Sequence, residues 1–283
     1  MKFTTLLQPA DLMGHLADPD WLVVDCRFDL TNPQAGEAAW ALGHIPGAAY
    51  AHLDRDLSGP VTARSGRHPL PAPQAFAATL SRWGVKPKTQ VVVYDNSAGQ
   101  LAARLWWMLH WMGHDAAAVL DGGLQAWVAH GGTQDNFSPG RPASRFVAHP
   151  RSGMTVDADQ LVGMLATDAC LLVDARATER FEGRSEPLDT VAGHVPGAVN
   201  HPSQWNLRPD GRLLAPAELR PRWAETLQTR AGDETVSMCG SGVTACHNLL
   251  AMAVAGIPGG RLYAGSWSEW IRDPGRAVAG GPA

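Results

Sequence analysis

The sequence of 283 residues contains three segments that occur twice, in the same order. Each segment recurs roughly 150 residues later, which is typical of a duplicated domain rather than a short structural repeat. The paired segments are Leu22–Arg27 with Leu171–Arg176, Gly43–Ala48 with Gly193–Ala198, and, more weakly, Leu120–Trp127 with Tyr263–Trp270. The chain is therefore predicted to fold as two copies of one domain, and it is long enough for each copy to have its own core.

The boundary between the copies is predicted from composition. The segment from about Gly131 to Gly153 is rich in Gly, Pro, Ser and Asn, as linkers are. We therefore expect a first domain over residues 1–135, a linker over 136–153 and a second domain over 154–283.

Short apolar runs alternate with helical patterns in both copies, and glycines such as Gly84 and Gly113 mark helix ends. The expected strands are Leu22–Asp25, Val91–Asp95, Ala118–Leu120, Cys170–Asp174 and Thr235–Met238. The expected helices are Pro9–Leu16, Pro73–Trp83, Gln100–Met112, Gly123–His130, Asp157–Leu165, Pro216–Leu227 and Val243–Ala255. This alternation predicts the α/β class, with a mostly parallel sheet flanked by helices in each copy.

Composition excludes several classes of function. A net charge of −4 gives no reason to expect nucleic acid or an anionic membrane as a partner. The four cysteines, Cys26, Cys170, Cys239 and Cys246, show no Cys-x-x-Cys spacing, which argues against a zinc site and a disulfide framework. No apolar run has the length of a signal peptide or a membrane span. We expect a reduced cytoplasmic protein without a metal.

Cys239 is the predicted nucleophile. It follows the expected strand Thr235–Met238, precedes the expected helix and has Gly240 and Gly242 beside it. Glycines let the backbone curl with several N–H groups facing inward, and the helix N-terminus adds partial positive charge. These dipoles stabilise a thiolate. The alternative is a small buried cysteine that only packs, which does not require such a cradle.

A similar loop occurs in cysteine phosphatases, which place an arginine at the sixth position after the cysteine. Here that position is Ala245, and no lysine or arginine lies between Cys239 and His247. A dianionic phosphate would meet only backbone dipoles, so the sequence disfavours a phosphatase.

The segment Cys-Gly-Ser-Gly-Val-Thr-Ala, residues 239–245, resembles the active-site loop of the rhodanese superfamily, in the form found in 3-mercaptopyruvate sulfurtransferases. Members that use thiosulfate typically carry basic residues just after the cysteine. This chain has Gly240 and Ser241 there instead. The resemblance extends over nearly the whole chain, because tandem rhodaneses also have two copies of one domain.

The resemblance implies a sulfurtransferase. Cys239 would take sulfur from 3-mercaptopyruvate, and the N–H groups of Gly240, Gly242, Val243 and Thr244 would hold the persulfide. A thiol acceptor, such as a small thiol or a thioredoxin-like protein, or cyanide in an assay, would then remove the sulfur without any cofactor. The alternatives are a thiosulfate sulfurtransferase and a sulfur carrier without turnover.

The first copy is predicted to be catalytically silent. Val91–Asp95 aligns with Thr235–Cys239, so that Asp95 stands where the second copy has its nucleophile. Residues present in both copies are expected to serve the shared fold rather than the chemistry. These pairs are Asp25 and Asp174, Arg27 and Arg176, and His44 and His194.

The family also has an aspartate and a histidine that form a relay with the loop serine. By resemblance these map onto Asp54, His68 and Ser241. The relay would handle the proton of the reaction.

Two arginines bind the substrate carboxylate in the family. The first maps onto Arg180, but the Glu-Pro-Arg stretch of the second reads Glu186-Pro187-Leu188 here. Arg184, four residues beyond Arg180, is the expected substitute, since one helical turn would place both side chains on one face. The alternative is that Arg184 is a solvated charge paired with Glu182 or Glu186.

Overall fold

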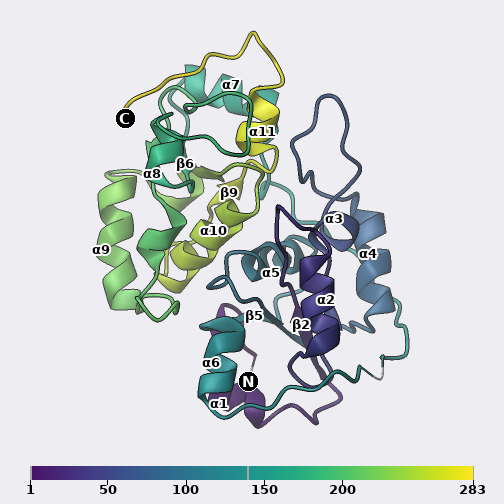
Figure 1. Cartoon of the computed structure of the whole chain (residues 1–283). Coiled ribbons are helices and arrows are strands. Elements are labelled where there is room, and N and C mark those ends of the chain that lie inside the picture. The colour runs from purple at the N-terminus through teal and green to yellow at the C-terminus, as the bar shows by residue number, and fades with distance from the viewer. Residues whose placement is uncertain (1, 139, 283) are drawn as a thin grey trace. The chain divides into compact units, whose positions relative to one another are not determined.

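The structure, a computed structural model, describes residues 2–138 and 140–282 (Figure 1). Its internal contacts divide the chain into two compact units. The first consists of Met1–Gly59, Pro71–Arg151 and Arg208–Leu213, and the second of Pro60–Leu70, Ser152–Leu207 and Leu214–Ala283. The segment Pro60–Leu70 thus groups with the second unit, although it lies within the first copy in sequence.

The first unit contains a five-stranded sheet with strand order β1-β5-β4-β2-β3, and every strand pair in it is parallel. The strands are β1 (Leu6–Leu7), β2 (Trp21–Asp25), β3 (Ala49–Tyr50), β4 (Gln90–Tyr94) and β5 (Ala117–Leu120). The helices are α1 (Pro9–Met13), α2 (Ala35–Leu42), α3 (Leu53–Asp56), α4 (Pro73–Arg82), α5 (Ala102–Trp111) and α6 (Gly123–Ala129).

The second unit contains a four-stranded parallel sheet with strand order β7-β6-β8-β9. The strands are β6 (Leu171–Asp174), β7 (Val199–Asn200), β8 (Thr235–Met238) and β9 (Arg261–Leu262). The helices are α7 (Ala158–Ala166), α8 (Thr178–Phe181), α9 (Pro216–Leu227), α10 (Thr244–Val254) and α11 (Ser266–Trp270), with 3-10 turns η1 (Ser203–Asn206) and η2 (Gly232–Glu234).

These two parallel sheets with flanking helices confirm the predicted fold class. Every strand and helix predicted from the sequence is present with ends shifted by a few residues at most. The elements that were missed are short or lack an apolar period, such as the two-residue strands β1 and β3 and the Ala-rich helix α2. No helix in the described part of the chain is long and apolar enough to cross a membrane.

A buried ion pair marks the end of the second strand in the first unit. Arg27 binds the Asp25 carboxylate through Nε and Nη2, and Nη2 also donates to the Gly43 carbonyl at 2.7 Å. The equivalent residues of the second unit are Asp174, Arg176 and Gly193. A buried arginine needs such a partner because an unmatched buried charge is costly. The pair therefore holds the fold together, as its presence in both copies predicted.

The histidines of the two Gly-His-x-Pro-Gly segments also have structural partners. His44 Nδ1 lies 2.8 Å from the Trp40 carbonyl, and its backbone pairs with that of Asp135. In the second unit the corresponding partners of His194 are Phe181 and Ala279. Each histidine thus links a helix end to the segment that follows α6 or α11.

A buried polar cluster lies in the second unit around His201. Its Nδ1 is 2.6 Å from Thr226 Oγ1, its Nε2 is 3.1 Å from Asn206 Oδ1, and its ring stacks on Trp223. Asn248 closes the cluster by donating to the His201 carbonyl. Burial lowers the pKa of His201 to about 4, because the charged imidazolium would be poorly solvated there.

This shift predicts a loss of stability in acid. The folded-state pKa of His201, about 4, lies below the ordinary value of 6.5, so the unfolded chain takes up the proton first as pH falls. The contribution of neutral His201 to the free energy of unfolding is complete above about pH 6.5. It is lost progressively as the pH falls towards about 4. Between pH 7 and pH 5 this residue alone should lower the free energy of unfolding by roughly 2 kcal/mol.

Urea unfolding of the wild type and of His201→Gln at both pH values measures this contribution. Burial also lowers the pKa of His110 and His114, so the wild-type fall includes other groups. The glutamine variant isolates His201, because it does not titrate and its fall should be smaller. An equal fall in the two proteins would contradict the prediction.

Candidate active site

Cys239 lies directly after β8 and before α10, in the strand-to-helix turn predicted for it. The last residue of β8, Met238, pairs with Asp174 of the neighbouring strand β6. Cys239 is therefore at the carboxyl end of a central parallel strand, where active sites of such sheets lie. Its side chain is almost completely buried.

Gly242 is required by the shape of this turn. Its φ is +76°, in the left-handed region, and a β-carbon at this position would lie 2.3 Å from the Ala264 carbonyl oxygen. Only glycine fits such a close backbone approach. The loop of residues 239–243 is thus pressed against the backbone at residue 264.

Ser266 anchors the nucleophile itself. The Cys239 amide donates to Ser266 Oγ at 3.0 Å, and that hydroxyl donates to the Tyr263 carbonyl. The Trp267 amide in turn donates to the Cys239 carbonyl at 3.0 Å. Ser266 has a φ of +53°, which is unusual for a residue with a side chain. Sequence reasoning assigned this residue no role, although it lies in the weakly repeated segment Tyr263–Trp270, because its contact with Cys239 joins distant positions.

Several backbone amides of the loop remain available for a ligand. Among the described residues, the N–H groups of Gly240, Ser241 and Val243 have no hydrogen-bond partner. The first turn of α10 follows directly, and its N-terminus adds partial positive charge. The turn is therefore suited to hold a negative charge.

In the first unit, the corresponding turn binds the carboxylate of Asp95. It follows β4 as Cys239 follows β8, and its carboxylate is fully buried. Oδ1 accepts from the amides of Ser97 and Gly99, and Oδ2 from those of Leu101 and Ala102, all at 2.8–2.9 Å. An anion at the position of the nucleophile is thus bound by four backbone N–H groups.

The two turns share a left-handed residue at the same position. Ala98 and Gly242 occupy the third position after Asp95 and Cys239, and their φ angles are +58° and +76°. The two turns thus bend alike at this position, but they differ at the next one, where φ is +80° at Gly99 and −91° at Val243. The first copy has the left-handed residue even though alanine is strained in this region.

His68 and Ser241 are brought together as the resemblance implied. His68 Nδ1 lies 2.8 Å from Ser241 Oγ, and both side chains are buried. The neighbouring Arg67 amide donates to Ser268 Oγ at 3.0 Å. At Gly66 a β-carbon would lie 2.4 Å from the Gly265 carbonyl oxygen, so the segment Pro60–Leu70 is tightly packed here.

Asp54, the third member expected for the relay, lies in α3 of the first unit. Its amide donates to His52 Nδ1 at 3.1 Å, as part of the N-terminal cap of that short helix. Its part in the relay stays a prediction.

Arg180 and Arg184 have different surroundings. Arg180 donates to Glu186 at 2.7 Å and to Asp189 at 3.2 Å, and all three side chains are largely buried. Arg184 is mostly exposed and pairs with the carboxylates of Glu182 and Glu179. It thus has the surface ion pairs of the alternative interpretation, and no contact joins it to the loop in the described part of the chain.

Arg67 is the basic residue that sequence reasoning missed. A β-carbon at Gly240 would lie 3.0 Å from Arg67 Nη2 and 3.5 Å from both terminal nitrogens of Arg180. Two guanidinium groups therefore lie beside the residue that follows the nucleophile. Arg67 pairs with Asp189, which is 122 positions away in sequence. No local pattern could reveal such a contact; its only signal was its place next to His68.

The two acids of this cluster titrate differently. Burial alone would raise the pKa of Glu186, but hydrogen bonds from Arg180 and from the Leu188 and Asp189 amides lower it overall. For Asp189, burial prevails over its arginine neighbours and raises the pKa. Glu186 is thus the firmly charged partner of Arg180.

The other three cysteines do not lie in a strand-to-helix turn like that of Cys239. Burial raises the pKa of Cys26 and Cys170, and nearby aspartates raise that of Cys26 further. The Cys246 thiol is completely buried and donates to the Gly242 carbonyl at 3.4 Å. These three thiols are therefore poor nucleophiles. The described residues also contain no group of three or more His, Cys, Asp or Glu side chains placed to hold a metal.

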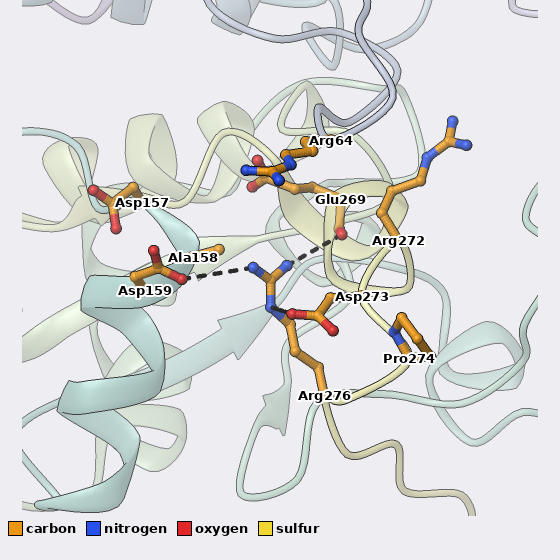
Figure 2. Close-up of a pocket in the computed structure, with 9 residues that line it drawn as sticks. All are labelled: Arg64, Asp157, Ala158, Asp159, Glu269, Arg272, Asp273, Pro274 and Arg276. Carbon is orange, nitrogen blue, oxygen red and sulfur yellow. Dashed lines mark hydrogen bonds and ion pairs between the residues drawn. The ribbon is translucent and has the colours of Figure 1, made fainter.

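A separate cavity of about 670 Å³ in the second unit holds no nucleophile (Figure 2). It is lined by Arg64, Asp157, Ala158, Asp159, Glu269, Arg272, Asp273, Pro274 and Arg276. Figure 2 shows Arg276 directed at Asp159, Asp273 and the Glu269 carbonyl. Because no cysteine lines it, we do not assign the reaction to this cavity.

Comparisons with known proteins agree with this geometry. The Rhodanese-like domain family matches residues 8–130 and 157–273. A Pseudomonas aeruginosa protein named as a probable 3-mercaptopyruvate sulfurtransferase is 48% identical over 283 residues, covering 99% of this chain and 100% of that protein. The Rattus norvegicus thiosulfate sulfurtransferase is 31% identical over 262 residues, covering 90% and 86%. The crystal structure of SseA from Escherichia coli, described among 3-mercaptopyruvate sulfotransferases, superimposes with a TM-score of 0.81 at 30% identity, covering 94% and 100%.

The buried carboxylate of Asp95 should be important for the stability of the first unit. In Asp95→Ala four backbone amides, two of them buried, lose their acceptor, which should lower the free energy of unfolding by about 3 kcal/mol. Asp95→Asn keeps one oxygen acceptor and should lose less. Denaturant unfolding of the three proteins tests this, and an alanine variant as stable as the wild type would refute the role of the carboxylate.

Proposed function

The chain belongs to the rhodanese-like family, and we propose that it is a sulfurtransferase that takes sulfur from 3-mercaptopyruvate through a persulfide on Cys239. The observation that supports this most directly is the anion-binding turn around Cys239, whose counterpart in the first unit holds the Asp95 carboxylate. The same kind of turn would hold the negatively charged outer sulfur of a persulfide.

The reaction divides into two transfers. The Cys239 thiolate attacks the sulfur of the donor, the carbon–sulfur bond breaks, and its electron pair leaves with carbon as the enolate of pyruvate. The thiol proton of the donor ends on this enolate, and the sulfur stays on Cys239 as a persulfide. In the second transfer an acceptor thiolate attacks the outer sulfur and the Cys239 thiolate leaves. Such covalent catalysis predicts ping-pong kinetics.

The amides of the turn stabilise charge in both transfers. Gly240, Ser241 and Val243 have N–H groups without a partner among the described residues, and Thr244 begins α10. Oriented N–H groups in a buried site stabilise a developing anion without the reorganisation that water would need. With Gly242 shaping the turn, this loop serves as the binding site for the transferred sulfur.

The proton is handled by Ser241 and His68. Their contact of 2.8 Å allows a proton to pass between the hydroxyl and the imidazole, and both lie beside the loop of the nucleophile. We assign Asp54 as the residue that orients His68 and stabilises its charged form, following the relay of the family. General acid–base catalysis of this kind is typically worth about a hundredfold or more in rate.

The charge near Gly240 favours a donor with one negative charge. Two arginines, Arg67 and Arg180, are matched there by two buried carboxylates, Glu186 and Asp189. The cluster as a whole is close to neutral, and a dianion such as thiosulfate would lack the excess of positive charge that it needs. The thiosulfate sulfurtransferase of the rat nevertheless makes thiosulfate the second candidate donor. The acceptor we propose is a small thiol or a thioredoxin-like protein.

Cys239→Ser should abolish sulfur transfer, because a serine hydroxyl cannot form a persulfide. Intact-mass measurement after treatment with mercaptopyruvate should show one added sulfur atom on the wild type and none on the variant. Cys170→Ser, which removes a thiol that burial keeps protonated, should keep the added sulfur.

Steady-state kinetics with mercaptopyruvate and thiosulfate side by side completes this test of the function. The proposal requires a larger kcat/KM for mercaptopyruvate. A wild type that accepts sulfur only from thiosulfate, or a serine variant that still turns over, would overturn the assigned donor or the assigned nucleophile.

His68→Ala should lower kcat about a hundredfold or more, because the proton is then no longer handled by a placed base. In a Ser241→Ala background the same change should cost much less, since the two residues act as one unit. The kinetics of the two single variants and the double variant measure this coupling. Equal losses in both backgrounds, or a lower melting temperature with unchanged kcat, would make His68 a structural residue.

A further inference from the structure

We propose that Arg67 and Arg180 together bind the carboxylate of the sulfur donor, with Asp189 as the positioning residue that holds the two guanidinium groups side by side. This inference rests on the proposed function and assigns Arg67, from the segment Pro60–Leu70, a role in substrate specificity. Neither the loop motif nor the region around Arg184 predicted it.

The geometry at Gly240 points to a pair of binding groups. Arg67 Nη2 and Arg180 Nη1 lie 3.0 Å and 3.5 Å from the position that a β-carbon on Gly240 would take. Gly240 directly follows Cys239, so an anion held by both guanidinium groups lies next to the nucleophile. In 3-mercaptopyruvate only three bonds separate the sulfur from the carboxylate carbon, and a donor held this way brings its sulfur to the cysteine.

Two of the guanidinium nitrogens near Gly240 are still available for a ligand. Arg67 donates to Asp189 through Nη1, and Arg180 donates to Glu186 and Asp189 through Nε and Nη2. Within the described part of the chain, Arg67 Nη2 and Arg180 Nη1 have no partner. Each guanidinium thus keeps a terminal nitrogen for a ligand, on its side towards Gly240.

Asp189 demonstrates that this pair can hold a carboxylate. Its Oδ1 binds Arg67 and its Oδ2 binds Arg180, and the side chain is 5% exposed. A bridging acid overcomes the repulsion that two guanidinium groups would otherwise exert on each other. It therefore fixes their spacing before a substrate arrives, and this lowers the entropy lost on binding.

Arg67 lies on a rigidly held piece of backbone. Its amide donates to Ser268 Oγ, and Gly66 packs directly on the Gly265 carbonyl. The side chain is 28% exposed, so that a small molecule in solvent can reach it. Leu188, in contrast, is apolar and contributes only its amide, which donates to Glu186. The second cation of the site thus comes from the segment of His68 rather than from the loop of Leu188.

The test compares Arg67→Ala with Arg64→Ala. Both arginines belong to the segment Pro60–Leu70, but Arg64 lines the separate cavity of Figure 2. Arg67→Ala should raise the KM for mercaptopyruvate about tenfold, equal to about 1.4 kcal/mol, with kcat changed much less. The Ki of pyruvate as an inhibitor competitive with the donor should rise by a similar factor. Arg64→Ala should leave both constants unchanged.

Arg67→Lys guards against an alanine variant that fails to fold. It keeps the charge but not the planar pair of donors, and should give a KM between those of the wild type and the alanine variant. Unchanged constants in both Arg67 variants, while Cys239→Ser still abolishes the persulfide, would overturn the role of Arg67 and leave the proposed function intact. Equal effects on mercaptopyruvate and thiosulfate would also overturn it, because thiosulfate has no carboxylate.

Discussion

The hydrogen bonds from backbone amides to an anion at the strand-to-helix turn are the interaction on which the rest of this molecule depends. In the first unit they hold the Asp95 carboxylate with four N–H groups, and in the second the equivalent turn surrounds Cys239. Such a turn needs a residue in the left-handed region, a helix that starts a few residues later, and a second loop packed against it. The close approach of Gly242 to residue 264 and the anchor at Ser266 satisfy the last need.

The strand-to-helix turn has a different role in each copy of the domain. The Asp95 carboxylate accepts from four backbone amides, so these amides are satisfied in the folded protein and the turn contributes to stability. Around Cys239 the amides gain a negatively charged acceptor only when the sulfur is ionised or when a persulfide has formed. Their hydrogen bonds are therefore completed during the reaction. The second unit thus keeps unpaired amides where the first unit has hydrogen bonds, an arrangement typical of functional sites.

Periodicity and the internal repeat were sufficient to predict both parallel sheets and the position of Cys239, because these depend on local sequence and on the order of elements. The resemblance supplied His68 and Ser241, which the structure places 2.8 Å apart. It could not supply Arg67 or Ser266, since their contacts with Asp189 and Cys239 join distant segments. The helical spacing of Arg180 and Arg184 suggested a shared face, but Gly183, at a φ of +76°, ends that turn and Arg184 pairs at the surface.

The two buried acids beside Gly240 weaken the attraction of the neighbouring arginines for anions. Unpaired, the arginines would bind any anion strongly, including a product that must leave, since a charge pair near a protein surface is worth several kcal/mol at close range. Glu186 and Asp189 cancel the long-range attraction of anions. They still leave Arg67 Nη2 and Arg180 Nη1 available to donate hydrogen bonds to a bound ligand. Selectivity then depends on geometry: a planar carboxylate can use both donors at once, while a charge without that shape gains little from a neutral cluster.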